Sequence, residues 1–372
     1  MSMPDWDAVR REFPALEGHT FLNTATYGQL PRATTKAVEE HFLRRDRFAC
    51  SDFIEWFDDA DRIRDSIARL IHCSREDVAF FPNASTAVSL LAQGIDWREG
   101  DRILTLEDEF PNHLYIAQSL ARADIVPWPR FLDALTPRTR LAMLSTVNYT
   151  TGLCPPLDRI AEACRANGTV LSIDGTQSIG ALRFDAARVQ PDMFAVDGYK
   201  WLCCPNGSGF AYIHPSVREW LKPQTVGWRS DKRWREVNSL HHGAPEFKES
   251  AERYEGGMLP FPLIYAMGAS VEFMLQLGAE AIERRVLELA GTLRDRLREL
   301  GARLLSDQDP LCVSPIVAAR WPDVDSEALS LELKRLRILT AARHGNLRVS
   351  THFYNNEDDI GRLIEALRKL LA

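Results

Sequence analysis

Residues 169–201 read TVLSIDGTQSIGALRFDAARVQPDMFAVDGYKW, and this stretch decides the fold. It holds two short apolar runs, TVLSID (169–174) and MFAVD (193–197), and each run predicts a β-strand. Because both runs are almost continuously apolar, they are typical of strands buried on both faces of a sheet. Asp174 closes the first run, and Lys200 follows shortly after the second. The two predicted strands therefore carry polar groups at their carboxyl ends, where open α/β sheets bind ligands.

The same alternation extends to both sides of this stretch, from about residue 75 to residue 215. Short β-rich runs alternate there with amphipathic helices. Further strands are predicted at 78–81, 102–107, 141–147 and 209–213, with helices that begin at Ser85 and Asn112 and another at 157–167. This order predicts a largely parallel sheet with helices on both faces.

The order of predicted helices and strands changes from about residue 262. Helices are predicted at 262–277, 279–300 and 326–336 and at the end of the chain, and short strands near 314–319, 338–341 and 347–351. We expect a large domain over residues 15–260 and a smaller α+β domain built from residues 1–14 and 261–372. Residues 222–256 are rich in Gly, His, Trp and charge, and a connection of that length predicts a functional loop.

Composition excludes several classes of protein. The chain has 372 residues, 45% of them hydrophobic and 26% charged, as in folded globular proteins rather than disordered chains. Its net charge of −7 comes without a stripe rich in Lys and Arg, so we expect no nucleic-acid partner. No stretch has the length and hydrophobicity of a signal peptide or a membrane span, which predicts a cytoplasmic protein with no membrane partner. The seven scattered cysteines predict neither a disulfide framework nor a metal site.

Asp174 and Lys200 together suit one particular cofactor. A buried lysine can form a Schiff base with the aldehyde of pyridoxal 5′-phosphate (PLP), while a carboxylate keeps the pyridine nitrogen protonated so that the ring withdraws electrons. For an Asp and a Lys taken in isolation, the ordinary interpretation is a structural ion pair beneath a loop.

A second feature lies at Phe81–Ala87, FPNASTA, where a strand turns into a helix that begins with small and hydroxylated residues. Free N–H groups and the helix dipole make such a start suitable for an anion, here the PLP phosphate. Taken alone, this segment is equally an ordinary helix N-cap. What favours the cofactor is that these features converge on one edge of one predicted sheet.

A series of motifs spans nearly the whole chain: FLNTATYGQLP (21–31), NAST (83–86), EFPNHLYIAQ (109–118), VNYTTG (147–152), SIDGTQSIGALRFD (172–185), DGYKW (197–201), PNGSGFAYI (205–213), GWRS (227–230), RYEGGMLP (253–260) and LRVSTHFYNNEDDI (347–360). Their order resembles the class V aminotransferases, a fold-type I PLP family that includes cysteine desulfurases, kynureninases and isopenicillin N epimerase-like proteins. The resemblance implies a mostly parallel seven-stranded sheet flanked by helices, and a smaller C-terminal α+β domain.

The resemblance also implies roles for individual residues. Lys200 would bind the cofactor aldehyde, Asp174 the pyridine nitrogen and Gln177 the phenolic oxygen, and Arg348 would receive the substrate α-carboxylate. Phe110 would stack on the ring. The phosphate would be held by Ala84, Ser85 and Thr86, with help from Tyr199 and from the indole N–H of Trp228.

The chain departs from the family pattern at several positions. No cysteine follows Cys312, so the nucleophilic cysteine loop of the desulfurases is missing. Met258 stands where many relatives place a threonine that reaches the phosphate of the neighbouring subunit. Asp197 stands where relatives have a small or hydroxylated residue, and a carboxylate there would repel a phosphate unless it points away. The roles of Asn148 and Arg343 stay open.

These observations lead to an expected activity. We expect a PLP-dependent enzyme that acts on a small α-amino acid, first of all an aminotransferase that also uses a keto acid. A β-lyase that cuts a carbon–sulfur bond, an amino acid epimerase, and a catalytically silent binding protein are the alternatives. Because family members build each active site from two subunits, we also expect a homodimer.

Overall fold

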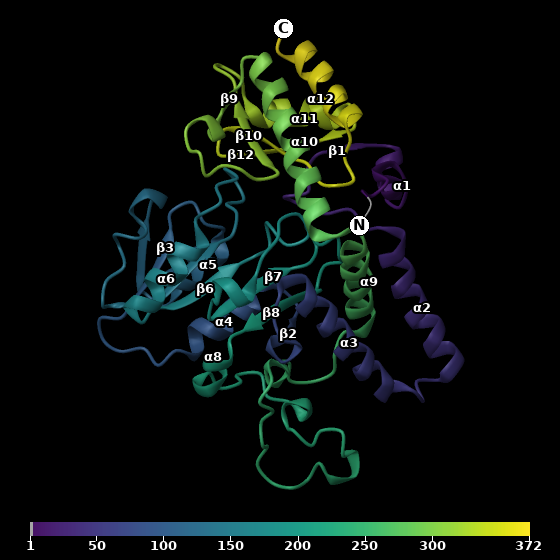
Figure 1. Cartoon of the computed structure of the whole chain (residues 1–372), viewed down its shortest axis with the longest axis vertical. Helices are drawn as coiled ribbons and strands as arrows, with labels where there is room; N and C mark the ends of the chain where they lie inside the picture. The colour runs from purple at the N-terminus through teal and green to yellow at the C-terminus, as the bar shows by residue number, and fades with distance from the viewer. Residues whose placement is uncertain (1–2) are drawn as a thin grey trace.

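A seven-stranded sheet forms the centre of the computed structural model, which describes residues 3–372 (Figure 1). The strands lie in the order β2-β8-β7-β6-β5-β3-β4. β8 is antiparallel to β2 and β7, and the other neighbours are parallel. The strands are β2 (Val78–Phe81), β3 (Arg102–Leu106), β4 (Ala123–Val126), β5 (Thr139–Ser145), β6 (Val170–Asp174), β7 (Met193–Asp197) and β8 (Gly209–Ile213). The predicted mostly parallel seven-stranded sheet is confirmed.

Except for the edge strand β4, the strands are buried on both faces, as their apolar runs predicted. In β7, Phe194 and Val196 belong to one apolar cluster, and Met193 and Ala195 belong to another on the opposite face. Helices cover both faces because each cluster needs its own cover. The helices between the strands are α4 (Ala84–Gly94), α5 (Pro111–Ser119), α6 (Leu157–Asn167) and α7 (Ala186–Val189), and α8 (Pro215–Trp220) follows the last strand.

Four further helices pack beside the sheet. Three of them precede its first strand in the sequence, and the fourth follows its last strand. They are α1 (Trp6–Arg11), α2 (Arg32–Phe48), α3 (Phe53–Ile71) and α9 (Phe261–Leu277). α9 packs against α2 and α3, and its buried residues join the same apolar cluster as those of α3. The three helices lie side by side in Figure 1.

A smaller antiparallel sheet forms the other unit, with the strand order β12-β13-β10-β9. Its strands are β9 (Arg303–Leu304), β10 (Ile316–Arg320), β12 (Ala341–Arg343) and β13 (Asn346–Ser350). The helices around it are α10 (Ala279–Glu299), α11 (Ser326–Arg335) and α12 (Glu357–Leu370). The N-terminal strand β1 (Thr20–Phe21) pairs with β11 (Ile338–Leu339), so the start of the chain joins this unit. The smaller α+β unit is confirmed as well.

The division into residues 15–260 and the remainder stays a prediction. The packing adds that α9 lies with the large sheet, whereas α10 runs from it into the small unit (Figure 1). Among residues 3–372 no single helix is long and apolar enough to cross a bilayer, and only the pair α9 and α10, bent by 82°, meets that test jointly. Short 3₁₀ helices complete the structure: η1 (Pro14–Glu17), η2 (Arg75–Asp77), η3 (Trp128–Arg130), η4 (Trp228–Ser230), η5 (Val237–Ser239), η6 (Ala251–Tyr254) and η7 (Leu305–Asp307).

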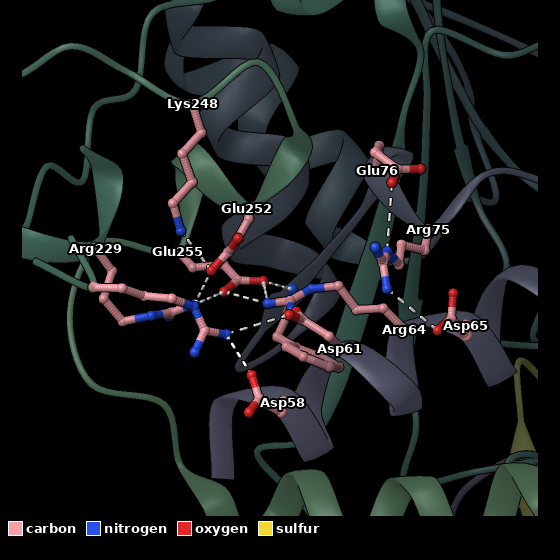
Figure 2. Close-up of polar contacts among 12 residues, drawn as sticks. Asp58, Asp61, Arg64, Asp65, Arg75, Glu76, Arg229, Lys248, Glu252 and Glu255 are labelled. Carbon is pink, nitrogen blue, oxygen red and sulfur yellow. Dashed lines mark hydrogen bonds and ion pairs between the residues drawn. The ribbon is translucent and has the colours of Figure 1, made fainter. Parts of the chain in front are cut away.

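The segment 222–256 extends from the body as an arm, visible at the bottom of Figure 1. A buried cluster of charges fastens its base, as Figure 2 shows. Glu255 accepts two hydrogen bonds from Arg64 at 2.6 and 2.7 Å and one from the backbone N–H of Phe80 in β2 at 2.8 Å. Arg229 binds both Glu252 and Glu255, and Lys248 binds Glu252. Each charge in the cluster therefore meets an opposite one away from water, which fixes the arm to α3 and the sheet.

This cluster predicts a large loss of stability when one partner is removed. Glu255 is 1% exposed, so Glu255→Gln leaves Arg64 and Arg229 short of a buried anion and is expected to lower the free energy of unfolding by about 3–5 kcal/mol. Asp295→Asn, which removes an exposed partner of Arg298, is the control and costs less than about 1 kcal/mol. Urea denaturation of the two variants measures this, and equal losses would contradict the role given to the cluster.

Candidate active site

One pocket brings five of the predicted residues together: Phe110, Asp174, Gln177, Tyr199 and Lys200. It lies at the carboxyl ends of the central strands, the edge at which open α/β sheets bind ligands. Its other lining residues are Asn112, Ser145, Tyr149, Thr176 and Asp197.

The backbone around Lys200 is fixed by a close approach of two segments. The N–H of Gly28 donates to the carbonyl of Tyr199 at 2.9 Å, and a Cβ on residue 28 would collide with the carbonyl oxygen of Lys200. Glycine is therefore required at position 28. The motif FLNTATYGQLP thus supplies the segment that lies against the lysine.

The Lys200 side chain is 7% exposed and has aromatic neighbours. Its Nζ lies 5.3 Å from the ring centre of Phe110 and 5.4 Å from that of Tyr199. Burial lowers the pKa of Lys200 to about 8; the charges of Arg348 and Arg343 lower it as well, and that of Asp174 opposes them. A lysine with this pKa is a neutral amine in about a tenth of the molecules at pH 7, far more than an ordinary lysine, which suits a nucleophile or a base.

Asp174 and Gln177 are held in the turn that follows β6. Asp174 is 6% exposed, and its Oδ1 accepts the N–H of Thr176 at 2.8 Å. Gln177 accepts from the indole of Trp201 at 2.8 Å and donates from Nε2 to the carbonyl of Ala25 at 3.1 Å. One hydrogen of the Gln177 amide is left for a ligand.

The predicted phosphate residues Ala84, Ser85 and Thr86 begin α4. Ser85 and Thr86 line a neighbouring hollow together with Gln224 and Thr225. The N–H of Thr86 already donates to Oδ1 of Asn83 at 2.8 Å. Asn83 is thus the cap of α4. The start of the helix lies beside the Lys200 pocket, because Asp197, which lines that pocket, contacts the backbone of Ala84.

Asp197 faces the same place. It is half-buried, lines the Lys200 pocket and accepts the backbone N–H of Ala84. Burial raises its pKa to about 6, and the charge of Asp174 raises it further while Ala84 and Lys200 lower it. The carboxyl of Asp197 thus lies at the start of the helix that would hold a phosphate, next to its cap Asn83.

Trp228 does not line the Lys200 pocket. Its ring packs edge-on against Phe57 and Trp234, with ring centres 6.0 and 5.4 Å apart, at the base of the arm.

Arg348 lies on β13 of the small sheet and reaches toward the pocket. It is 1% exposed and donates to the carbonyl of Tyr149 at 2.7 Å and to the hydroxyl of Thr26. Because Tyr149 lines the Lys200 pocket, this hydrogen bond joins the two units at the site.

The sequence interpretation missed a buried group behind the pocket. Glu109 accepts from the N–H and the hydroxyl of Ser145, both at 2.6 Å, and meets Nδ1 of His113 at 3.2 Å. Burial alone would raise the pKa of Glu109, but the contacts with His113 and Ser145 hold it below its usual value. Burial alone would lower the pKa of His113, but Glu109 holds it above its usual value. The signal was present as a Glu and a His four residues apart in EFPNH; the structure places Glu109 just before the N-cap Phe110 of α5 and His113 in the first turn of that helix.

An amine and a carboxylate on adjacent strand ends, with an aromatic ring against the amine, fit PLP. The start of α4 fits the phosphate, although the carboxyl of Asp197 beside it would repel a phosphate when it is ionised. The sheet and this pocket together define a PLP-dependent enzyme of fold type I.

Comparison with known proteins gives the family. The model of the family "Aminotransferase class-V" matches residues 29–363. The chain belongs to this family, whose members depend on PLP.

Relatives and solved structures agree along the full length. The chain is 29% identical to isopenicillin N epimerase of Streptomyces clavuligerus, over 100% of this chain and 99% of that protein. It is 22% identical to a probable cysteine desulfurase of Methanothermobacter thermautotrophicus, over 97% of both chains. A solved complex of the cystine C-S lyase C-DES with cysteine persulfide is 25% identical, with a TM-score of 0.86, and covers 95% of this chain and 98% of its own.

Asp197 predicts a pH-dependent affinity for the cofactor. The carboxyl is mostly neutral at pH 5 and mostly charged at pH 8, where it repels a phosphate. We expect Asp197→Asn to bind PLP about tenfold more tightly than the unmodified protein at pH 8, and equally well at pH 5. Cofactor fluorescence titrations measure this.

Pyridoxal, which lacks the phosphate, is the control ligand. Its dissociation constant should not distinguish the two proteins at either pH. The role of Asp197 would be contradicted if the ratio of the two proteins' dissociation constants for PLP were the same at pH 5 and at pH 8.

Proposed function

We propose that this enzyme transfers the amino group of a small α-amino acid to a keto acid, with Lys200 moving the proton of the substrate Cα. When bound, PLP supplies an aldehyde carbon that binds amines and a ring that withdraws electrons. The chain supplies the base, the charges that orient the ligands and a site with little water.

Each predicted residue has a part in this proposal. Lys200 would hold the aldehyde carbon, Asp174 the ring nitrogen and Gln177 the phenolic oxygen, with Phe110 against the ring. Ala84, Ser85, Thr86, Tyr199 and Trp228 are proposed for the phosphate. The convergence of Phe110, Asp174, Gln177, Tyr199 and Lys200 on one pocket supports these roles.

One observation carries the choice of transamination. Among the residues that line the pocket, Lys200 has the one amine, and the other titratable groups are two carboxyls and two phenols. A single amine can remove a proton from one atom of a ligand and return it to another on the same side. Epimerisation by two bases needs a second base on the other side of the ligand. The pocket offers no second amine for this, and the phenol of Tyr149, edge-on to Phe110, would have to serve.

A carbon–sulfur lyase is the second candidate. It requires the same removal of the Cα proton, and its support is the likeness to a structure described as a cystine C-S lyase. Among the residues that line the pocket there is no cysteine, so nothing there could take up sulfur as a protein persulfide.

Arg348 is proposed to receive the substrate α-carboxylate. Its guanidinium is buried and donates hydrogen bonds to Tyr149 and Thr26. Both partners are neutral, so the positive charge stays unpaired. A planar guanidinium binds a carboxylate through two parallel hydrogen bonds, so it can fix the orientation of Cα toward Lys200.

The products of a single turnover test the function. The holoenzyme, mixed with an amino acid and no keto acid, should release one keto acid and leave the cofactor as pyridoxamine phosphate. Release of pyruvate and ammonia would instead identify a β-lyase. Formation of the enantiomer of the substrate would identify an epimerase. Lys200→Ala should remove the visible absorbance of the bound cofactor and slow turnover at least about 10²-fold, while Lys222→Ala, at an exposed lysine, should change neither.

The arm supports a homodimer, which we propose as the assembly. It extends beyond the body of one chain, and Val226, Val237 and Met258 are exposed along it and beside it (Figure 1). Light scattering is expected to give twice the 42.1 kDa mass of the chain. A monomer with full activity would refute the proposal.

A further inference from the structure

Two arginines share one face of the small sheet. β12 and β13 form an antiparallel hairpin in which Ala341 lies opposite Arg348 and Arg343 lies opposite Asn346. Because side chains alternate between faces along a strand, Arg343 and Arg348 lie on the same face. Leu347 points to the other face, where it joins the core of the small unit.

That face looks toward the cofactor pocket, because both ends of the hairpin meet Tyr149. Arg348 donates to the carbonyl of Tyr149 at 2.7 Å, and Nε2 of His344, at the hairpin turn, lies 3.3 Å from its hydroxyl. Tyr149 itself lines the pocket with Lys200. Arg343 therefore lies between the two points at which the hairpin touches the site.

The spacing of the two arginines follows from the register. Diagonal neighbours on one face of an antiparallel pair are about 7–8 Å apart at Cα. Arg343 and Arg348 are neighbours of this kind, so their side chains can bind two groups of one small molecule at once.

Neither arginine has an anionic partner among residues 3–372. Arg343 donates only to the carbonyl of Ala342, and the contacts of Arg348 are to a carbonyl, a hydroxyl and the amide of Asn23. Nε of Arg348 is buried without any partner. Buried charges in proteins are normally paired.

The two positive charges also repel each other. Burial lowers the pKa of Arg348 to about 9, and the charge of Arg343 adds to this effect. The same charge contributes to the lowered pKa of Lys200. An anionic ligand would relieve this repulsion, whereas the arm cluster of Arg64 and Glu255 is already balanced.

We propose that the substrate is an α-amino acid that carries a second carboxylate on its side chain, with the α-carboxylate on Arg348 and the second carboxylate on Arg343. The assignment rests on the proposed function, since it places the α-amino group at Lys200. Arg343 is half-buried and next to the exposed hairpin turn, so its guanidinium remains accessible to a charged group of a ligand.

Matched amino acids test the substrate class by binding alone. The absorbance spectrum of the holoenzyme is recorded while L-aspartate, L-glutamate or L-2-aminoadipate is added, and again with L-asparagine and L-glutamine. At least one diacid is expected to bind about tenfold or more tightly than the neutral amides. If the amides bind as tightly as every diacid, or if no diacid alters the spectrum, the proposal is overturned.

Substitutions locate the second carboxylate. Arg343→Gln should weaken the preferred diacid about tenfold or more and leave the amides within about twofold, whereas Arg348→Gln should weaken both. Arg343→Lys should restore part of the diacid affinity, because it keeps the charge. Arg320→Gln, at an exposed arginine on β10 of the same sheet, is the control and should change nothing.

The outcomes separate this inference from the proposed function. An unchanged diacid affinity in Arg343→Gln overturns the role of Arg343 even if transamination is observed. A diacid preference that depends on Arg343, together with pyruvate and ammonia as products, supports the substrate class and overturns only transamination.

Discussion

The structure depends on keeping the Lys200 amine and the Asp174 carboxylate side by side with little water. The two groups are 7% and 6% exposed. Such burial is costly for any charge, so both side chains must be fixed by the strands from which they emerge. β6 and β7 are parallel and adjacent, which brings their carboxyl ends together, and Gly28 lets a third segment close over the lysine. The apolar clusters on both faces of the sheet hold this geometry.

Charge is treated differently in the two parts of the molecule. At the base of the arm, Arg64, Arg229 and Lys248 meet three carboxylates, those of Asp61, Glu252 and Glu255, so the cluster is balanced and stabilises a connection. At the pocket, Arg343 and Arg348 of the small sheet are paired with no carboxylate of residues 3–372. A site that holds unpaired charges in fixed positions is prepared to bind ions of the opposite sign and to stabilise charge as it develops. The first arrangement serves the fold, and the second serves the ligands.

Much of the fold could be predicted because its strands are buried on both faces. The runs at 78–81, 193–197 and 209–213 correspond to β2, β7 and β8 without any shift. β4 was not recognised from the pattern, since ADIV (123–126) lies at the edge of the sheet and is only partly buried, which leaves no continuous apolar run. The pairing of β1 with β11 could not be predicted either, because two-residue strands carry no periodicity.

The sequence by itself determined the kind of sheet and the chemical groups at its carboxyl edge, because alternating apolar runs and the residues that follow them are local properties. It also gave the family, through the order of its motifs. Only the tertiary structure decided which groups share an environment: Asp197 with the start of α4, Glu109 with His113 and Ser145, and Arg348 with Tyr149. Except for the pair Glu109 and His113, these partners are far apart along the chain. The pKa values of these groups and their unpaired hydrogen-bonding atoms depend on burial and on distances that arise only when segments distant in the sequence pack together.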